Sequence, residues 1–311
     1  MSDLLTNAFL TAFVTGTITA GLPLLLAGLG EQISEKAGVL NIGLEGMMLV
    51  GAYGAFVAAF YSGSIWLGFA VGGLCGIVPA LLMALCCVRL GMNQIVIGIA
   101  LTLGAEGITS LAHHVQFSRS YPRLPKVATL EIPALSKLPV LGESLFNSQP
   151  LVYLALLLVG LLAWIFRASH VGLNLQAAGD KPSALDAAGV SVIATRSWAV
   201  VATGFLGGVG GAYLCTVGAG LFVPFMTNGA GFIAIVLAML ARGRPVWVLG
   251  GAMLFSGCLS VATALQVAGF NIPTDVVQMI PFAMVMIVLV LFARRAHLPA
   301  ALGLPYQRGA R

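Results

Sequence analysis

The sequence predicts an all-α protein that crosses a membrane several times. Its 311 residues are 59% hydrophobic and only 8% charged, whereas a soluble domain carries about 25% charged residues. The mean hydropathy is +1.02, and several apolar runs reach the length of about 20 residues that a membrane-spanning helix needs. Strands of a membrane barrel would alternate apolar and polar residues, and we find no such alternation, so helices are the expected spanning element.

Apolar runs mark the expected spans in order along one transmembrane domain, 1–311. They cover 8–29, 39–60, 65–88, 93–115, 150–167, 193–217, 229–241, 245–265 and 274–294. We therefore predict about 8–10 transmembrane helices, at least one of them broken or half-length. The 229–241 run is short for a full crossing, so it is either a half-helix or continues from residue 221. The stretch GEQISEKAG, between the first two spans, is either a loop or a break within the membrane.

Positive charges set the expected orientation, because short cytoplasmic loops carry an excess of lysine and arginine. Alternate crossings place ten basic residues on one side: Arg89, Arg167, Lys181, Arg196, Arg242, Arg244, Arg294, Arg295, Arg308 and Arg311. We assign this side to the cytoplasm, which leaves 116–149 as an external loop. Four residues of that loop count against the assignment: Arg119, Arg123, Lys126 and Lys137. The same parity puts the N-terminus outside, although a broken second span would move it inside.

The N-terminus and the cysteines predict neither a cleaved leader nor a metal site. No basic segment precedes the first apolar run and no small-residue cleavage site follows it, so we expect a retained helix. The five cysteines lie in or near apolar runs, where they would pack as small apolar side chains. No CxxC pair or Cys/His cluster has metal-ligand spacing. The net charge of +5 needs no nucleic acid to explain it.

The stretch EKAGVLNIGLEGMMLVGAYGAF, 35–56, places polar groups in an otherwise apolar run. Asn41 and Glu45 are four residues apart, so on a helix they would share one face. An ionisable group inside a membrane costs about 2.5–3.5 kcal/mol on insertion scales, and it normally faces the bundle interior or an aqueous path. Two interpretations stay open: these residues border the substrate path, or Glu45 is a structural carboxylate that accepts backbone N–H groups.

Two further sets are candidates for the substrate path. Asn93 and Gln94 open the 93–115 span, and Glu106 lies deeper within it, either lining the path or holding helices together. His113 and His114 follow, and we expect both to be solvated at the outer interface.

The third set covers the glycine-rich stretch before the 229–241 run and the first residues of that run. Phe222, Phe225 and Phe232 flank Asn228 there. Aromatic rings stack on a nucleobase or a sugar face, while amides hydrogen-bond to its edges. A discontinuous helix also exposes backbone groups to a substrate. The alternative is a packed turn between two helices.

Glycines recur at the GxxxG spacing that permits close helix contact. The pairs are Gly72 and Gly76, Gly204 and Gly208, and Gly207 and Gly211. We expect them to pack helices within the chain rather than to form a dimer seam.

The main polar insertion is HVGLNLQAAGDKPSALDAAGVSV, 170–192, on the expected cytoplasmic side. Pro182 suits the first turn of a short helix, and the alanines would give it a surface that another protein can approach closely. An ordinary amphipathic loop is the alternative. The chain has no GxxxxGK[ST] motif, so it has no loop of this kind to cradle the phosphates of ATP.

Three motifs, in this order, resemble the permease subunits of bacterial ABC importers: GVLNIGLEGMMLVGAYGA, GLNLQAAGDKPSALDAAGVSV and GAGFIAIVLAMLARGRPVWVLGGAMLFSG. The chain is most similar, over about residues 16–295, to nucleoside-type and simple-sugar permeases of the branched-chain amino acid and simple-sugar permease superfamily. The resemblance implies that 170–192 is a cytoplasmic coupling segment, with a coupling helix that docks into a separate ATPase. The expected coupling residues are Gly172, Asn174, Ala177, Ala178, Gly179, Asp180, Ala187, Ala188 and Gly189. The glutamate common in the coupling motifs of more distant permeases has no counterpart in this sequence, and Gln176 precedes the alanine pair instead.

The resemblance further implies a multi-pass transport subunit of the bacterial inner membrane, with no catalytic residue and no cofactor of its own, since the partner uses ATP. The expected partners are an ABC ATPase, a solute-binding protein outside the cytoplasm and membrane lipid. The resemblance also implies a second permease, a longer paralogue of this chain, with which it forms a heterodimer. The expected substrate is a nucleoside. Ribose-like sugars or branched-chain amino acids are the alternatives, as is proton-coupled secondary transport through Glu45 or Glu106.

Overall fold

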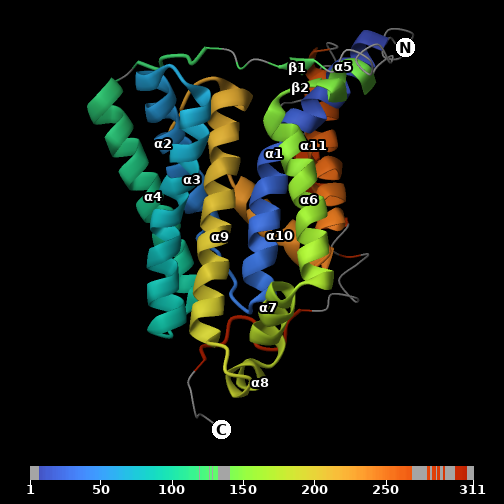
Figure 1. The fold of residues 1–311 in the computed structure, drawn as a ribbon. Helices are drawn as coiled ribbons and strands as arrows, with labels where there is room; N and C mark the ends of the chain where they lie inside the picture. Colours follow the sequence, from blue (N-terminus) through green and yellow to red (C-terminus); the bar gives the residue numbers. More distant parts are fainter. Residues whose placement is uncertain are drawn as a thin grey trace.

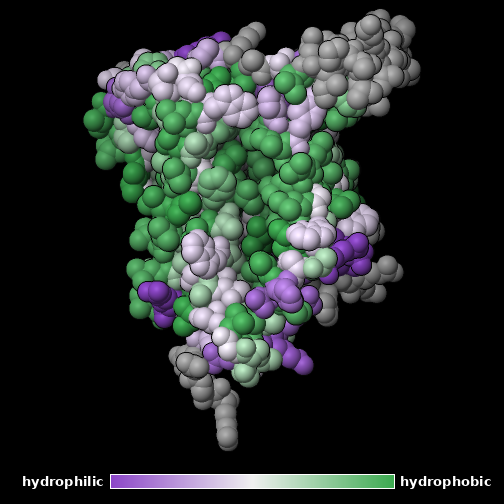
Figure 2. Space-filling model, in the orientation of Figure 1, coloured by the Kyte–Doolittle hydropathy of each residue, from purple (hydrophilic) through white to green (hydrophobic). Residues whose placement is uncertain are grey.

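The computed structural model is a bundle of long helices. It describes residues 7–118, 120–125, 127, 129–131, 141–267, 279–280, 282–284, 286–287, 290 and 298–306. Within these residues, six helices are long and apolar enough to cross a membrane, and two shorter apolar helices accompany them. The long helices run side by side, and a belt of hydrophobic side chains covers the middle of the visible face (Figures 1 and 2). The predicted all-α polytopic membrane fold is confirmed.

The elements follow the expected spans closely. In chain order they are α1 (Asn7–Lys36), α2 (Leu44–Ser62), α3 (Ile65–Met83), the π-helix η2 (Ala84–Arg89), α4 (Gln94–Phe117), β1 (Leu130–Glu131), α5 (Leu141–Phe146), β2 (Asn147–Ser148), α6 (Pro150–Ala168), α7 (His170–Asp180), α8 (Pro182–Ala187), α9 (Val192–Tyr213), the π-helix η3 (Leu214–Ala219), α10 (Ala230–Ala241) and α11 (Pro245–Val267). The expected 274–294 span lies largely outside the described residues.

The first helix is longer than the sequence predicts, because GEQISEK continues α1 instead of forming a loop. Its Glu, Gln, Ile and Lys residues are compatible with a helix. The break comes at 37–43, where Gly38 adopts φ 87°, a left-handed conformation that glycine tolerates best. Polar side chains from Glu31 to Glu35 are consequently inside the bundle.

The predicted half-helix is confirmed as α10. Its 12 residues span roughly 18 Å, well short of the ~30 Å hydrocarbon thickness of a bilayer. Turns over 220–229 precede it and include four positive φ angles, at Gly220, Phe225, Asn228 and Gly229. The chain therefore changes direction inside the bundle before α10 begins.

Glycines bring α2, α3 and α9 into backbone contact. A methyl group on Gly76 would meet the Gly204 carbonyl and would lie 2.8 Å from Gly208 Cα, and one on Gly51 would meet the Gly208 backbone. A methyl group on Gly211 would strike the carbonyl of Met48. The GxxxG glycines therefore pack helices within the chain, as the sequence predicts.

The two ends of the bundle carry different elements (Figure 1). At one end, α5 packs beside the start of α1, where Ser144 Oγ donates to the Thr11 carbonyl at 3.1 Å. The nearby strands β1 and β2 pair antiparallel, with Leu130 opposite Ser148. The described part of the 116–149 loop also reaches the α9–α10 break, since Leu124 N donates to the Gly220 carbonyl at 2.7 Å. α7 and α8 lie at the opposite end.

A pair of glycine substitutions tests this packing. Gly211→Ala is expected to lower the stability of the folded protein by about 1–3 kcal/mol, because the added methyl group overpacks α9 against α2. Gly160→Ala is the matched control, since its methyl group would have no neighbour within 4 Å, and alanine favours a helix by about 0.5–1 kcal/mol. Thermal unfolding of the purified protein in detergent would measure both. Equal melting temperatures for the two variants would contradict the close-packing account.

Candidate functional site

Glu45 joins the start of α2 to the start of the half-helix α10. Its Oε1 accepts the backbone N–H of Gly229 at 2.8 Å, and its Oε2 accepts that of Gly231 at 2.6 Å. The first N–H groups of a helix have no partner within the helix, and a negative charge is stabilised there. A methyl group on Gly231 would lie 2.6 Å from Glu45 Cα, so this close approach requires glycine.

Asn41 does not share a helix face with Glu45, so that prediction is wrong. The α2 helix begins at Leu44, and Asn41 lies in the α1–α2 break, because the turn at Gly38 ends the preceding helix. The Asn41 backbone N–H donates to Glu31 Oε1 at 3.0 Å, and its side-chain amide lies 3.3 Å from Met47 Sδ. Gln94 holds the same break, since its Oε1 accepts the Leu40 N–H at 2.8 Å.

Three candidate path residues lie at the exposed side of the α9–α10 break. Phe225 and Phe232 are 54% and 43% exposed, and Asn228 is exposed as well. Asn228 lies in the turn just before α10, with φ 44°, and Phe232 lies in the first turn of that helix. Phe225 adopts φ 63°, a conformation uncommon for a bulky residue. This segment therefore presents two aromatic rings and an amide beside a helix start.

Phe222 is separate from this exposed set. It is fully buried, and its ring lies 5.1 Å from that of Tyr53 and 5.5 Å from that of His113. His113 is buried too, stacked on Tyr121 at 5.2 Å, so its expected solvation at the interface is wrong. Residues after α4 fold back over it, which the apolar pattern of α4 did not reveal. His114 is exposed, as expected.

Asn93 directly precedes α4, and Glu106 lies within that helix. Asn93 caps that helix, since its Oδ1 accepts the N–H groups of Ile95 and Val96 at 2.9 and 3.2 Å. Glu106 is half-buried, one turn from the buried Thr102 and Thr109. Among the described hydrogen bonds, none links the side chain of Asn93 or Glu106 to α10. The structure thus groups Glu45 with the start of α10, and Asn41 with Gln94.

Polar residues at the end of α1 were missed by the sequence prediction. Glu31, Gln32 and Glu35 are at most 4% exposed. Both polar atoms of Gln32, and one carboxylate oxygen of each glutamate, have no hydrogen-bond partner among the described residues. The available signal is the spacing of Glu31 and Glu35, which are four residues apart, in a stretch for which the sequence predicts either a loop or a break within the membrane.

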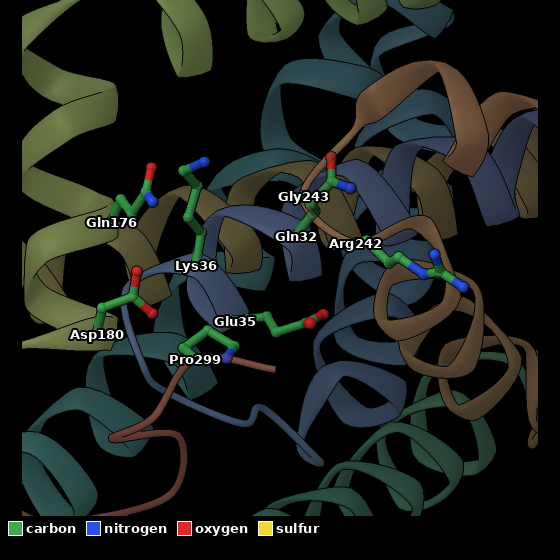
Figure 3. A pocket seen from close by; sticks show the side chains of 8 residues that line it. All are labelled: Gln32, Glu35, Lys36, Gln176, Asp180, Arg242, Gly243 and Pro299. Carbon is green, nitrogen blue, oxygen red and sulfur yellow. The ribbon is translucent and has the colours of Figure 1, made fainter. Parts of the chain in front are cut away.

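A small pocket opens beside this part of α1 (Figure 3). It lies where α1, α7, the α10–α11 turn and the C-terminal segment meet. Its lining residues are Gln32, Glu35, Lys36, Gln176, Asp180, Arg242, Gly243 and Pro299. Within the described part of the chain, no three His, Cys, Asp or Glu side chains are placed to hold a metal ion.

The expected coupling residues divide into two groups. Gly172, Ala178 and Gly179 are buried, and a methyl group on Gly179 would meet the carbonyl of Lys36. Ala187, Ala188 and Gly189 are exposed at the end of the bundle, while Asn174, Ala177 and Asp180 are half-buried. Ser169 caps α7 by accepting the Gly172 N–H at 3.1 Å. One group therefore packs α7 onto the protein, and the other forms a small-residue surface.

A sequence profile of the family described as branched-chain amino acid transport system / permease component matches residues 13–289. The chain belongs to this family. The profile covers the helices from α1 to α11, so both breaks and the α7–α8 segment lie within it. The resemblance read from the three sequence motifs is confirmed.

Three relatives are similar over most of the chain. A putative glucose ABC transporter permease protein of Haloferax volcanii is 42% identical over 80% of this chain and 76% of its own length. The nucleoside ABC transporter permease protein NupC of Lactococcus lactis is 32% identical over 96% and 97%. The guanosine ABC transporter permease protein NupQ of Bacillus subtilis is 29% identical over 97% and 98%. In the same organisms, the permease proteins TsgB13, NupB and NupP are similar at 25%, 25% and 26% identity.

Substitution of Glu45 tests its part in this site. Glu45→Ala leaves the N–H groups of Gly229 and Gly231 without their acceptor, so we expect a loss of roughly 1.5–3 kcal/mol of stability for each charged hydrogen bond. Glu45→Gln keeps one acceptor oxygen and should lose less. Thermal unfolding in detergent would give the order wild type, Gln, Ala.

Glu106→Gln is the control for Glu45, since it removes a half-buried charge that makes no described hydrogen bond. Its stability should change by less than about 0.5 kcal/mol. The outcome that would contradict the role of Glu45 concerns the Glu45→Gln variant itself. If that variant is as stable as the wild type and transports normally, the charge of Glu45 is not required.

Proposed function

We propose that the chain is one of two membrane subunits of an ABC importer that carries a nucleoside across the bacterial inner membrane. The observation that carries this proposal is similarity to two proteins named as nucleoside and guanosine permeases, which extends over 96% and 97% of the chain. The exposed Phe225, Phe232 and Asn228 support it, because rings and amides suit the face and the edge of a nucleobase.

Energy would come from a separate ATPase. The chain lacks the phosphate-binding loop of such an enzyme, and the exposed alanines of α8 offer a surface on which one can dock. A second, paralogous permease is supported by the relatives, since each of the three organisms has two similar permease proteins. The end opposite α7 and α8 would then face outside and receive a solute-binding protein.

The half-helix α10 suits a path that opens alternately to the two sides. A helix that begins inside the bundle presents unpaired backbone groups and side chains at mid-depth. Glu45 uses two of those N–H groups, so the substrate would meet mainly the rings and the amide nearby. Such weak, neutral contacts fit an uncharged solute that a binding protein delivers.

A sugar is the second candidate substrate. The relative of highest identity among those described, at 42%, is named a putative glucose permease, and an aromatic ring packs equally well on a sugar face.

Uptake measurements test the proposal. In cells that express the whole transporter, we expect deletion of this subunit to abolish uptake of labelled uridine and adenosine. That uptake should resist competition by excess glucose, ribose and leucine, and should persist in the presence of an uncoupler while ATP is held constant. Loss of uptake with the uncoupler alone would favour a proton-coupled carrier instead.

A different uptake result would change the proposed substrate without changing the proposal that the chain is a permease. Unchanged nucleoside uptake in a strain that lacks other nucleoside carriers, combined with lost glucose uptake, would overturn the nucleoside proposal and support the sugar candidate.

The docking surface, formed by α8 and the two residues that follow it, Ala188 and Gly189, has its own test. Ala188→Arg should reduce the ATPase subunit recovered with the permease by about tenfold or more, because a bulky side chain in a close-packed interface costs roughly 1–3 kcal/mol. Ser62→Arg adds the same side chain to an exposed residue at the opposite end, and should leave recovery unchanged. Equal recovery of the ATPase with both variants would argue against docking at α8.

A further inference from the structure

Arg196 is a buried cation that contacts three separate parts of the chain. It lies near the start of α9 and is only 2% exposed. Its Nε donates to the Ala37 carbonyl at 3.1 Å, its Nη1 to the Leu304 carbonyl at 2.7 Å, and its Nη2 to the Ala178 carbonyl at 3.0 Å. The described hydrogen bonds of this guanidinium therefore all go to backbone carbonyl oxygens. Its partners belong to the α1–α2 break, the C-terminal segment and α7.

Backbone hydrogen bonds tie the same three parts together. Ala301 N donates to the Gly179 carbonyl at 2.8 Å, and Gly303 N donates to the Gly38 carbonyl at 3.1 Å. A methyl group on Gly38 would lie 2.9 Å from Arg196 Nη2 and 3.0 Å from Gly179 Cα. The end of α7 and the α1–α2 break are thus in backbone contact, with residues 298–306 laid across both. We call Arg196 together with 298–306 the arginine clasp.

The α1–α2 break leads directly to the site at α10. Beyond Gly38, the N–H groups of Leu40 and Asn41 are held by Gln94 and Glu31. Only a few residues further, Glu45 holds the start of α10. Hydrogen bonds and the backbone of residues 37–45 thus connect the end of α7 with the start of the half-helix.

We propose that Arg196 is a positioning residue that ties the coupling segment to the α1–α2 break, so that movement of α7 moves Glu45 and the start of α10. This inference rests on the proposed function, because it needs an ATPase subunit to move α7. Arginine suits the role, since its planar fork donates in several fixed directions at once. A lysine carries the same charge but donates from one point.

The test uses the complete transporter in proteoliposomes. ATP hydrolysis is measured together with import of whichever labelled compound, uridine, adenosine or glucose, the wild-type complex carries. In Arg196→Gln, import per ATP hydrolysed should fall by about tenfold, within the range reported for substitutions along coupling networks, while assembly with the ATPase and ATP hydrolysis persist. Arg196→Lys should fall in between. Arg89→Gln is the control, because Arg89 is an exposed arginine of the expected cytoplasmic side.

Hydrogen–deuterium exchange distinguishes coupling from a purely structural role, because loss of structure alone would not uncouple the ATP-dependent change in 37–43 from that in α7. In the wild type, ATP binding should change exchange both in α7 and in 37–43. In Arg196→Gln, the change in α7 should remain and the change in 37–43 should be lost. Deletion of the residues from 298 onward should have the same effect as Arg196→Gln. Combining the deletion with Arg196→Gln should add little, because each change alone already disrupts the arginine clasp.

Wild-type import per ATP in Arg196→Gln would overturn the inference. If that variant fails to assemble, Arg196→Lys and the deletion decide: loss of assembled complex without a change in import per ATP would assign Arg196 to folding alone. A wild-type complex that shows no ATP-driven import would instead overturn the proposed function, before any substitution is considered.

Discussion

Lipid offers no hydrogen bonds to an interrupted helix, and this constraint governs the whole structure. Every backbone group freed by a break within a membrane needs a partner from the protein. The protein interrupts its helices before α2 and before α10, and buried side chains serve both places. Glu31 and Gln94 accept the N–H groups of the first break, and Glu45 accepts those at the start of α10. Buried polar side chains are therefore part of the architecture here, in a chain that carries little charge overall.

The two breaks lie among helices that are closely packed against one another. α9 lies against α1, α2 and α3, and at Gly76, Gly204 and Gly208 its contacts are backbone to backbone. Such contacts leave little room for a helix to bend or rotate. In contrast, 37–43 and 220–229 are short connections with left-handed residues. Movement within the protein would then concentrate at the two breaks while the packed helices keep their arrangement.

The sequence predicts the helices well because a spanning run is long and apolar, and little else in a chain resembles it. It predicts the half-helix for the same reason, since α10 is too short to cross. It fails where tertiary contact decides. GEQISEK looks like a loop because it is polar, yet α1 continues through it and the surrounding protein buries it. Phe222 and Phe225 look alike in sequence, but only the fold buries one and exposes the other. For Arg196 the sequence predicts only a place on the cytoplasmic side, because its carbonyl partners are far from it in the chain.

The role of Glu45 in the fold also bears on what the path can recognise. Both oxygens of this carboxylate already accept backbone N–H groups, and the start of a helix stabilises a negative charge, so Glu45 serves the fold rather than a solute. The groups left exposed beside it are rings and one amide. If solutes cross at this point, they are held by stacking and a few hydrogen bonds, which suits release more than tight binding. In the proposed importer, the solute-binding protein would therefore do most of the selecting, and the permease would constrain only the class of substrate.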